Sequence, residues 1–223
     1  LGDSQLWPQA SKRAKIWVTA RPPKTGGGAV SRTCCPICEA SGANVQEVTR
    51  GMGLDARIGT RFLQAGLGFG GSCFPKDLSA FIKIADQLGY DFQLLKEVQR
   101  INAGQMERFV KKLTDTLWVL KDKKIGVLGL AFKQNTDDVR MSPAIDLCQR
   151  LLKEGASLRV FDPKAMDKAK AVLPPGPTIT YVADMNDIAA GCDAVEEPGG
   201  DVEVVELGGP SHHEVGVGRV RDR

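Results

Sequence analysis

Short apolar segments alternate with helical segments between residues 123 and 194, and this alternation constrains the fold more than any other feature of the chain. Strands are predicted over 124–130, 158–161 and 179–182, and helices over 143–154, 164–172 and 184–190. Strands that alternate with helices along a chain usually form a parallel sheet covered by helices. The sequence therefore predicts an α/β fold for this part of the chain.

The preceding region, residues 36–120, has a mainly helical pattern around one glycine-rich stretch. Helices are predicted over 44–52, 78–88 and 92–117, with a glycine-rich loop over 53–77. Asp77 is a good N-cap for the second helix, and Gly89 is a typical stop. We therefore expect a helical central segment, followed over 121–195 by a Rossmann-like parallel-sheet domain. We expect that sheet to be truncated, because the composition of 196–223 does not continue it.

The two ends of the chain differ from its middle. Residues 1–35 hold six basic residues and one acidic residue without any regular period, and we expect them to be poorly ordered. Residues 196–223 contain six glycines and no aromatic residue. The whole chain is 42% apolar and 26% charged with a net charge of +3, which indicates a soluble globular protein. It gives no reason to expect a nucleic acid or a membrane as partner, and the missing secretory signal favours the cytoplasm.

Cys73 is the first candidate catalytic residue. It follows glycines at 66, 68, 70 and 71, which allow the backbone to approach a ligand closely. Positive charge from nearby Lys76 and from loop amides favours a nucleophilic thiolate, and Asp77 is placed to orient water. The alternative is that Cys73 is a small buried apolar residue and that Asp77 only caps a helix.

Basic residues also follow the first predicted strand of the sheet. Ligands of open α/β sheets bind at the carboxyl ends of the strands, where Lys133 and Arg140 suit phosphate contacts. The glycines at 126 and 129 do not have the spacing of a dinucleotide-binding turn. A plain solvated loop is the alternative. For Arg57 two interpretations are likewise open: it binds an anionic group of a ligand, or it is a plain surface charge.

Cys35 and Cys38 form a Cys-x-x-Cys pair, with Cys34 beside it. A structural zinc site needs a second pair of ligands at suitable spacing, and His212 and His213 are far away in the sequence. We therefore expect no metal site.

Three segments occur in a characteristic order: Gly-Met-Gly-Leu-Asp-Ala-Arg-Ile-Gly (51–59), Gly-Leu-Gly-Phe-Gly-Gly-Ser-Cys-Phe-Pro-Lys-Asp-Leu (66–78) and Gly-Leu-Ala-Phe-Lys-Gln-Asn-Thr-Asp-Asp-Val-Arg (129–140). Together they closely resemble the UDP-glucose branch of the UDP-glucose/GDP-mannose dehydrogenase family. The resemblance implies NAD-dependent oxidation of UDP-glucose to UDP-glucuronate in two steps, through a cysteine thiohemiacetal and thioester. Another nucleotide-sugar dehydrogenase, of the GDP-mannose type, is the alternative within the family.

The resemblance also implies roles for individual residues. Cys73 matches the catalytic cysteine and Asp77 the aspartate that helps to activate water, while Lys76 and Arg140 match positions that contact NAD. Substrate contacts are implied for Arg57, Phe62, Gln64, Ala65, Gly66, Leu67, Gly68, Phe69, Gly70, Phe132 and Lys133. The partner subunit supplies the arginine equivalent to Arg57 in some members, and the intact family forms homodimers.

The family pattern extends beyond the matched part of this chain. It includes an N-terminal NAD-binding domain, and a catalytic lysine and asparagine whose positions fall near Trp17 and Arg21. Neither residue can do that chemistry, so we expect the chain to be an inactive fragment without the NAD domain, or a non-catalytic remnant that binds a nucleotide sugar. We hypothesise that both flanks are translated out of frame, because resemblance and periodicity end near residues 36 and 195.

Overall fold

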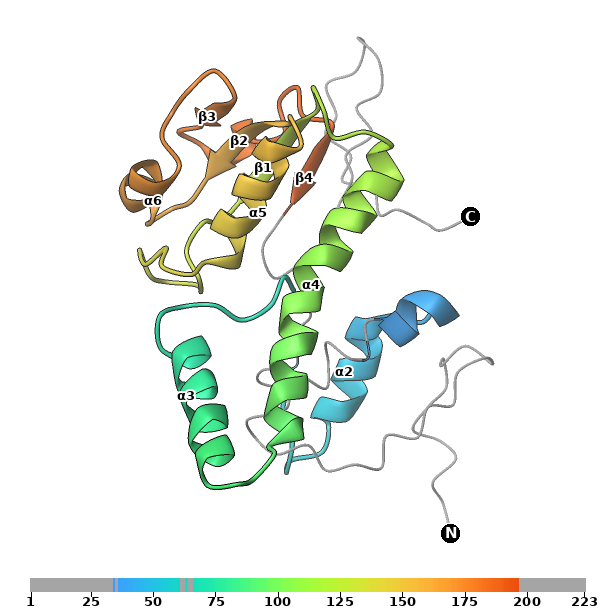
Figure 1. Cartoon of the computed structure of the whole chain (residues 1–223). Coiled ribbons are helices and arrows are strands. Elements are labelled where there is room, and N and C mark those ends of the chain that lie inside the picture. The colour runs from blue at the N-terminus through green and yellow to red at the C-terminus, as the bar shows by residue number, and fades with distance from the viewer. Residues whose placement is uncertain (1–33, 35, 61–62, 64–65, 197–223) are drawn as a thin grey trace. The chain divides into compact units, whose positions relative to one another are not determined.

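The structure is a computed structural model that describes residue 34, residues 36–60, residue 63 and residues 66–196 (Figure 1). The chain divides into two compact units, residues 1–65 and residues 66–223. The predictions of a poorly ordered N-terminus over 1–35 and of a tail over 196–223 that does not continue the fold lie outside the described residues, except at residues 34 and 196.

The first unit contains helix α2 (Val45–Gly53), in agreement with the helix predicted over 44–52. Asn44 begins it as N-cap, and its side-chain oxygen accepts a hydrogen bond from the backbone N–H of Gln46 at 2.8 Å. This contact satisfies one of the amides that a helix N-terminus leaves without a partner. Cys38 and Leu63 are each 2% exposed and belong to the small core of this unit.

The second unit begins with two helices, α3 (Phe74–Gln87) and α4 (Gln93–Leu117), which pack against each other. The start predicted for α3 at residue 78 is wrong by four residues. Pro75 lies in the first turn, where its fixed φ favours a helix and its missing N–H costs nothing. Asp77 is therefore not the N-cap, which is Cys73, and lies instead in the first turn of the helix.

A parallel four-stranded sheet follows, with the strand order β3-β2-β1-β4. The strands are β1 (Lys124–Leu128), β2 (Ser157–Phe161), β3 (Ile179–Tyr181) and β4 (Ala194–Glu196), and the helices between them are α5 (Pro143–Lys153), α6 (Met166–Val172) and the single 3-10 turn η1 (Met185–Asp187). Helix α5 packs on β2, and α4 packs on α5 (Figure 1). The predicted fold class, a helical segment followed by a Rossmann-like parallel sheet, is confirmed.

The end of one strand and the presence of another differ from the prediction, each for an identifiable reason. Strand β1 ends at Leu128 rather than at residue 130, because Gly129 has a φ of +89° and turns the chain out of the sheet. Strand β4 was not expected, yet it pairs in parallel with β1 and buries Ala194 completely. The ladder with β1 provides the hydrogen bonds that hold these three residues in a strand, despite the glycine-rich sequence that follows them.

The core of the second unit lies around the sheet and joins it to α4 and α5. Ile125, Val127, Leu147 and Leu151 are 0% exposed, and each stabilises the fold by roughly 1.5–3 kcal/mol through burial. Leu67 from the glycine-rich loop belongs to the same core. Within the described part of the chain, no helix has the length and apolar character needed to cross a bilayer.

Candidate active site

Cys73 ends the glycine-rich loop and is the N-cap of α3, with an exposed side chain. Its carbonyl oxygen accepts the backbone N–H of Asp77 at 2.9 Å, which closes the first helical turn. The Ser72 hydroxyl lies 3.8 Å from the Cys73 sulfur. The partial positive charge of a helix N-terminus favours negatively charged groups at this position.

The glycine-rich loop packs tightly against the loop that connects β1 to α5. The backbone N–H of Gly71 donates to the Met141 carbonyl at 3.2 Å. A Cβ added at Gly70 would lie 2.2 Å from that same carbonyl oxygen, and one at Gly71 would lie 2.7 Å from the Phe132 ring. Gly71 also has a φ of +86°. These two positions therefore require glycine, and Cys73 is held next to the loop that carries Phe132.

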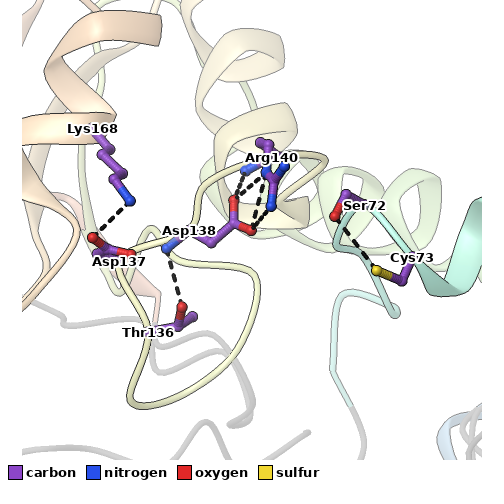
Figure 2. Close-up of polar contacts among 7 residues, drawn as sticks. All are labelled: Ser72, Cys73, Thr136, Asp137, Asp138, Arg140 and Lys168. Carbon is purple, nitrogen blue, oxygen red and sulfur yellow. Dashed lines mark hydrogen bonds and ion pairs between the residues drawn. The ribbon is translucent and has the colours of Figure 1, made fainter.

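Arg140 lies on the same loop as Phe132, where it pairs with Asp138 (Figure 2), and it interacts electrostatically with Cys73. The Asp138 carboxylate accepts hydrogen bonds from the Arg140 side chain, at 3.0 Å from Nε and 2.7 Å from Nη2, and from its backbone N–H at 2.9 Å. The hydrogen bond from Arg140 is the main cause that lowers the pKa of Asp138 to about 2. Hydrogen bonding to Asp138 is likewise the main reason why the pKa of Arg140 is raised, and the negative form of Cys73 adds to it. The guanidinium is thus fixed in orientation and remains exposed to a ligand.

Asp162, directly after β2, holds the start of this loop in place. Its carboxylate is 5% exposed and accepts the backbone N–H groups of Leu130 at 2.7 Å and Ala131 at 3.0 Å. It also accepts those of Lys164 and Ala165, each at 2.7 Å. Burial acts to raise the pKa of Asp162, but the four backbone hydrogen bonds outweigh it and the pKa is lowered.

A second contact ties the same loop to helix α6. The Lys168 ammonium lies 2.7 Å from the Asp137 carboxylate, and both side chains are more than half exposed (Figure 2). An exposed pair of this kind contributes little to stability. The pair does link this loop to α6. Three acidic residues, Asp137, Asp138 and Asp162, thus make contacts that hold the loop between β1 and α5.

Residues 31–104 match the central domain of the UDP-glucose/GDP-mannose dehydrogenase family, and residues 126–196 match the UDP-binding domain of the same family. The chain belongs to this family. The two matches contain both loops of the candidate site, with Cys73 in the central domain and Arg140 in the UDP-binding domain.

Named members of this dehydrogenase family are similar over the same region. The UDP-glucose 6-dehydrogenase TuaD of Bacillus subtilis is 47% identical over 149 residues, which are 67% of this chain and 32% of TuaD. The UDP-glucose 6-dehydrogenase of Drosophila melanogaster is 48% identical over 131 residues, which are 57% of this chain and 28% of the relative. The chain thus spans about a third of the length of these curated relatives.

Two solved dehydrogenase structures share the fold. A UDP-glucose dehydrogenase from the hyperthermophilic archaeon Pyrobaculum islandicum has a TM-score of 0.69 and 40% identity, over 78% of this chain and 39% of that protein. A GDP-mannose dehydrogenase from Pseudomonas aeruginosa has a TM-score of 0.53 and 28% identity, over 79% of this chain and 42% of that protein.

Most of the residues that the family resemblance singled out belong to the same compact unit. Cys73, Lys76, Asp77, the loop residues 66–70, Phe132, Lys133 and Arg140 all lie in the second unit. The Lys133 ammonium lies 5.2 Å from the centre of the Phe132 ring, a distance at which a cation and an aromatic face attract each other. Lys76 and Asp77 are both largely exposed, with 4.0 Å between ammonium and carboxylate.

Other predicted residues lie elsewhere or outside the described residues. Arg57 is in the first unit, where it pairs with Asp55; hydrogen bonding to Asp55 and the charge of Asp55 raise its pKa. Positions outside the described residues are Trp17, Arg21, Cys35, Phe62, Gln64, Ala65, His212 and His213. Cys38 is buried, and burial is the main reason why the pKa of its thiol is raised. The described residues contain no group of three or more metal-binding side chains.

Sequence reasoning missed three residues that shape the site: Asn102 on α4, Asp138 and Asp162. Asp138 had a usable signal, because an aspartate two residues before an arginine can form a turn that binds the arginine backbone. Asp162 had a weaker signal as the acidic residue at the end of a strand. Asn102 had none, because its contact spans 33 residues of sequence.

Proposed function

We propose that this chain carries the nucleophile and part of the substrate site of a UDP-glucose 6-dehydrogenase, which oxidises UDP-glucose to UDP-glucuronate. The observation that supports this best is the exposed Cys73 thiol at the N-terminus of α3, in electrostatic range of Arg140. The similar proteins favour UDP-glucose over GDP-mannose as substrate, since the UDP-glucose dehydrogenase structure is the more similar of the two described above.

Cys73 would act after the first oxidation has converted the C6 alcohol of the sugar to an aldehyde. Its sulfur attacks C6, the new S–C bond forms, and the carbonyl oxygen takes up a proton to give a thiohemiacetal. Loss of a hydride from C6 and of the hydroxyl proton then leaves a thioester. Water attacks the thioester carbon, the C–S bond breaks, and the thiol returns as the carboxylate is released.

Asp77 would assist the hydrolysis of that thioester. Its backbone is bonded to Cys73 one helical turn away, and its carboxylate is 70% exposed, so water has access to it. A carboxylate that accepts a proton from the attacking water makes the oxygen a better nucleophile.

The glycine-rich loop and the loop after β1 would hold the sugar diphosphate. The side chain of Leu67 is buried in the core, so residue 67 can contact a ligand only through its backbone. Phe132 and Lys133 offer an aromatic face and a cation from the opposite loop. We also propose substrate contacts for Arg57, Phe62, Gln64 and Ala65, with Arg57 acting on a second copy of the chain in a homodimer.

NAD, when bound, supplies the hydride acceptor for both oxidations. The residues near Cys73 fit its reactive half, because Lys76 and Arg140 are both more than 70% exposed and can pair with its phosphate or ribose oxygens. The loop after β1 lacks the tight glycine turn of a dinucleotide site, so we do not assign the rest of NAD to this sheet. A reactive thiol must remain reduced, which supports a cytoplasmic location.

The proposal is tested by alkylation of Cys73 with iodoacetamide, followed residue by residue with mass spectrometry. We expect millimolar UDP-glucose to slow this alkylation, and GDP-mannose to do so less. An alkylation rate that neither compound changes would contradict the proposal. Formation of NADH at 340 nm that disappears in Cys73→Ser would place the full reaction on this chain. Protection of Cys73 without NADH formation would mean that this chain carries the substrate site and the reactive thiol but does not complete the oxidation.

A further inference from the structure

Asn102, on α4, binds the backbone of the glycine-rich loop with both ends of its side-chain amide. Its Oδ1 accepts the backbone N–H of Phe69 at 2.7 Å, and its Nδ2 donates to the Phe69 carbonyl at 3.1 Å. This pair of hydrogen bonds copies the way in which one strand binds its neighbour in a sheet. Phe69 thereby has both of its backbone polar groups satisfied in a loop that has no regular structure.

The neighbouring glycine fits this contact closely. Gly68 has a φ of +120°, and a Cβ added to it would lie 2.8 Å from the Asn102 Oδ1 atom. Side-chain-bearing residues rarely adopt that φ, and any side chain at 68 would push the amide away from Phe69. The residues at 68 and 102 are therefore matched to each other.

The contact continues from Phe69 to the reactive cysteine. The Phe69 ring meets the Phe74 ring edge to face, with 4.6 Å between the ring centres. Phe74 is the first residue of α3 and follows Cys73 directly. A movement of Phe69 away from Asn102 would therefore disturb the packing that fixes the start of α3.

Helix α4 is a rigid support for this contact. Met106 and Leu113 of α4 are 4% and 1% exposed and share one core with Leu67 of the glycine-rich loop. Asparagine is a poor helix former, so its place in the interior of a 25-residue helix costs some stability, which the contact with Phe69 offsets.

We propose that Asn102 is a positioning residue, which fixes the glycine-rich loop through Phe69 so that the loop can bind the sugar diphosphate and present Cys73. This inference rests on the proposed function for its ligand but not for its geometry. Asn102 itself touches neither the substrate nor the thiol. An aspartate at 102 can accept the N–H of Phe69, but its second carboxylate oxygen would face the Phe69 carbonyl oxygen and repel it. The contact therefore requires the N–H donor of the asparagine amide, and a side chain of the same shape does not replace it.

The first test measures hydrogen exchange of the Phe69 amide in the wild-type chain by NMR. We expect its exchange to be at least about tenfold slower than the intrinsic rate of an unstructured amide of the same sequence, as one direct hydrogen bond predicts. Exchange at the intrinsic rate would overturn the inference without the need for any variant.

The second test compares Asn102→Asp with Gln99→Leu. Gln99 is one turn away on α4 and donates to the Ser79 hydroxyl on α3 at 2.8 Å, so its loss also removes one contact between helices but leaves the loop untouched. We expect Asn102→Asp to raise the UDP-glucose concentration that half-protects Cys73 by about tenfold, with a smaller effect on the melting midpoint, and Gln99→Leu to leave that concentration unchanged.

The outcomes separate the two proposals. If UDP-glucose fails to protect Cys73 in the wild type, the proposed function fails, while the exchange of Phe69 and the alkylation rate of Cys73 still decide the role of Asn102. If Asn102→Asp does not fold, Gly68→Ala disturbs the same contact from the loop side and is expected to change the same rates. Unchanged rates in the folded variants would overturn the inference.

Discussion

The Asp162 carboxylate accepts the backbone N–H of Leu130 at 2.7 Å, which joins the ends of two neighbouring parallel strands. With its other three backbone donors, this buried group has its charge balanced by amides alone. In many nucleotide-binding sheets an acidic residue after the second strand binds a ribose. Here the Asp162 carboxylate instead binds backbone amides of the loop that carries Phe132 and Arg140. It is therefore not available to bind a ribose in the usual way.

Replacing Asp162 with asparagine should destabilise the second unit by about 3 kcal/mol, because the amide turns a donor toward backbone N–H groups and leaves buried donors without a partner. Urea denaturation followed by circular dichroism measures the loss. Asp167→Asn is the matched control, since the Asp167 side chain is 100% exposed, and its effect should stay within about 0.5 kcal/mol. Equal effects for the two variants would show that the backbone contacts of Asp162 carry no stability.

The Asp138–Arg140 contact should give a pH dependence that can be assigned to one group. The pKa of Asp138 in the folded chain is about 2, below the ordinary value of 3.8. The stabilisation that this contact provides is therefore complete above about pH 4 and is lost as the pH falls toward 2. NMR titration of the Asp138 carboxyl carbon should give a midpoint near 2 in the wild type. In Arg140→Gln the midpoint should rise toward 3.8. A midpoint that Arg140→Gln leaves in place would contradict the contact.

Gly70→Ala and Gly104→Ala should act in opposite directions. The new Cβ at 70 would lie 2.2 Å from the Met141 carbonyl oxygen, so the two loops must separate at a cost of about 3 kcal/mol. At Gly104, in the interior of α4, a Cβ meets no atom within 4 Å, and alanine should stabilise by about 0.5–1 kcal/mol. The melting midpoints of the two variants measure both effects. Losses of equal size at both positions would contradict the tight packing at Gly70.

The described cysteines should differ strongly in reactivity. Cys73 is exposed, whereas Cys148 and Cys192 are 0% exposed, and burial is the main reason why the pKa of Cys192 is raised. Under native conditions a disulfide reagent should modify Cys73 at least about tenfold faster than the buried thiols of Cys38, Cys148 and Cys192. In denaturant the rates should converge. Peptide mass spectrometry separates these sites from Cys34, which is partly exposed. Equal native-state rates at Cys73, Cys148 and Cys192 would contradict the exposure assigned to Cys73.

Prediction from the sequence succeeded where local pattern decides the structure. Helix α4 was placed within one residue and β2 within one residue, because periodicity and flanking glycines act within a few positions. It failed at β4 and at the start of α3. The ladder to β1 is a long-range contact, and a proline in the first helical turn reads equally well as the end of a loop.

By itself the sequence determined the α/β fold and the family, since these depend on residue order and on motifs that lie within one segment. The tertiary structure alone decided how Cys73 is presented. Asn102 reaches Phe69 across 33 positions, Asp162 reaches Leu130 across 32, and Gly71 meets Phe132 from a different loop. Such contacts depend on distance in space and on the loss of water around polar groups, and neither is recorded in the order of residues.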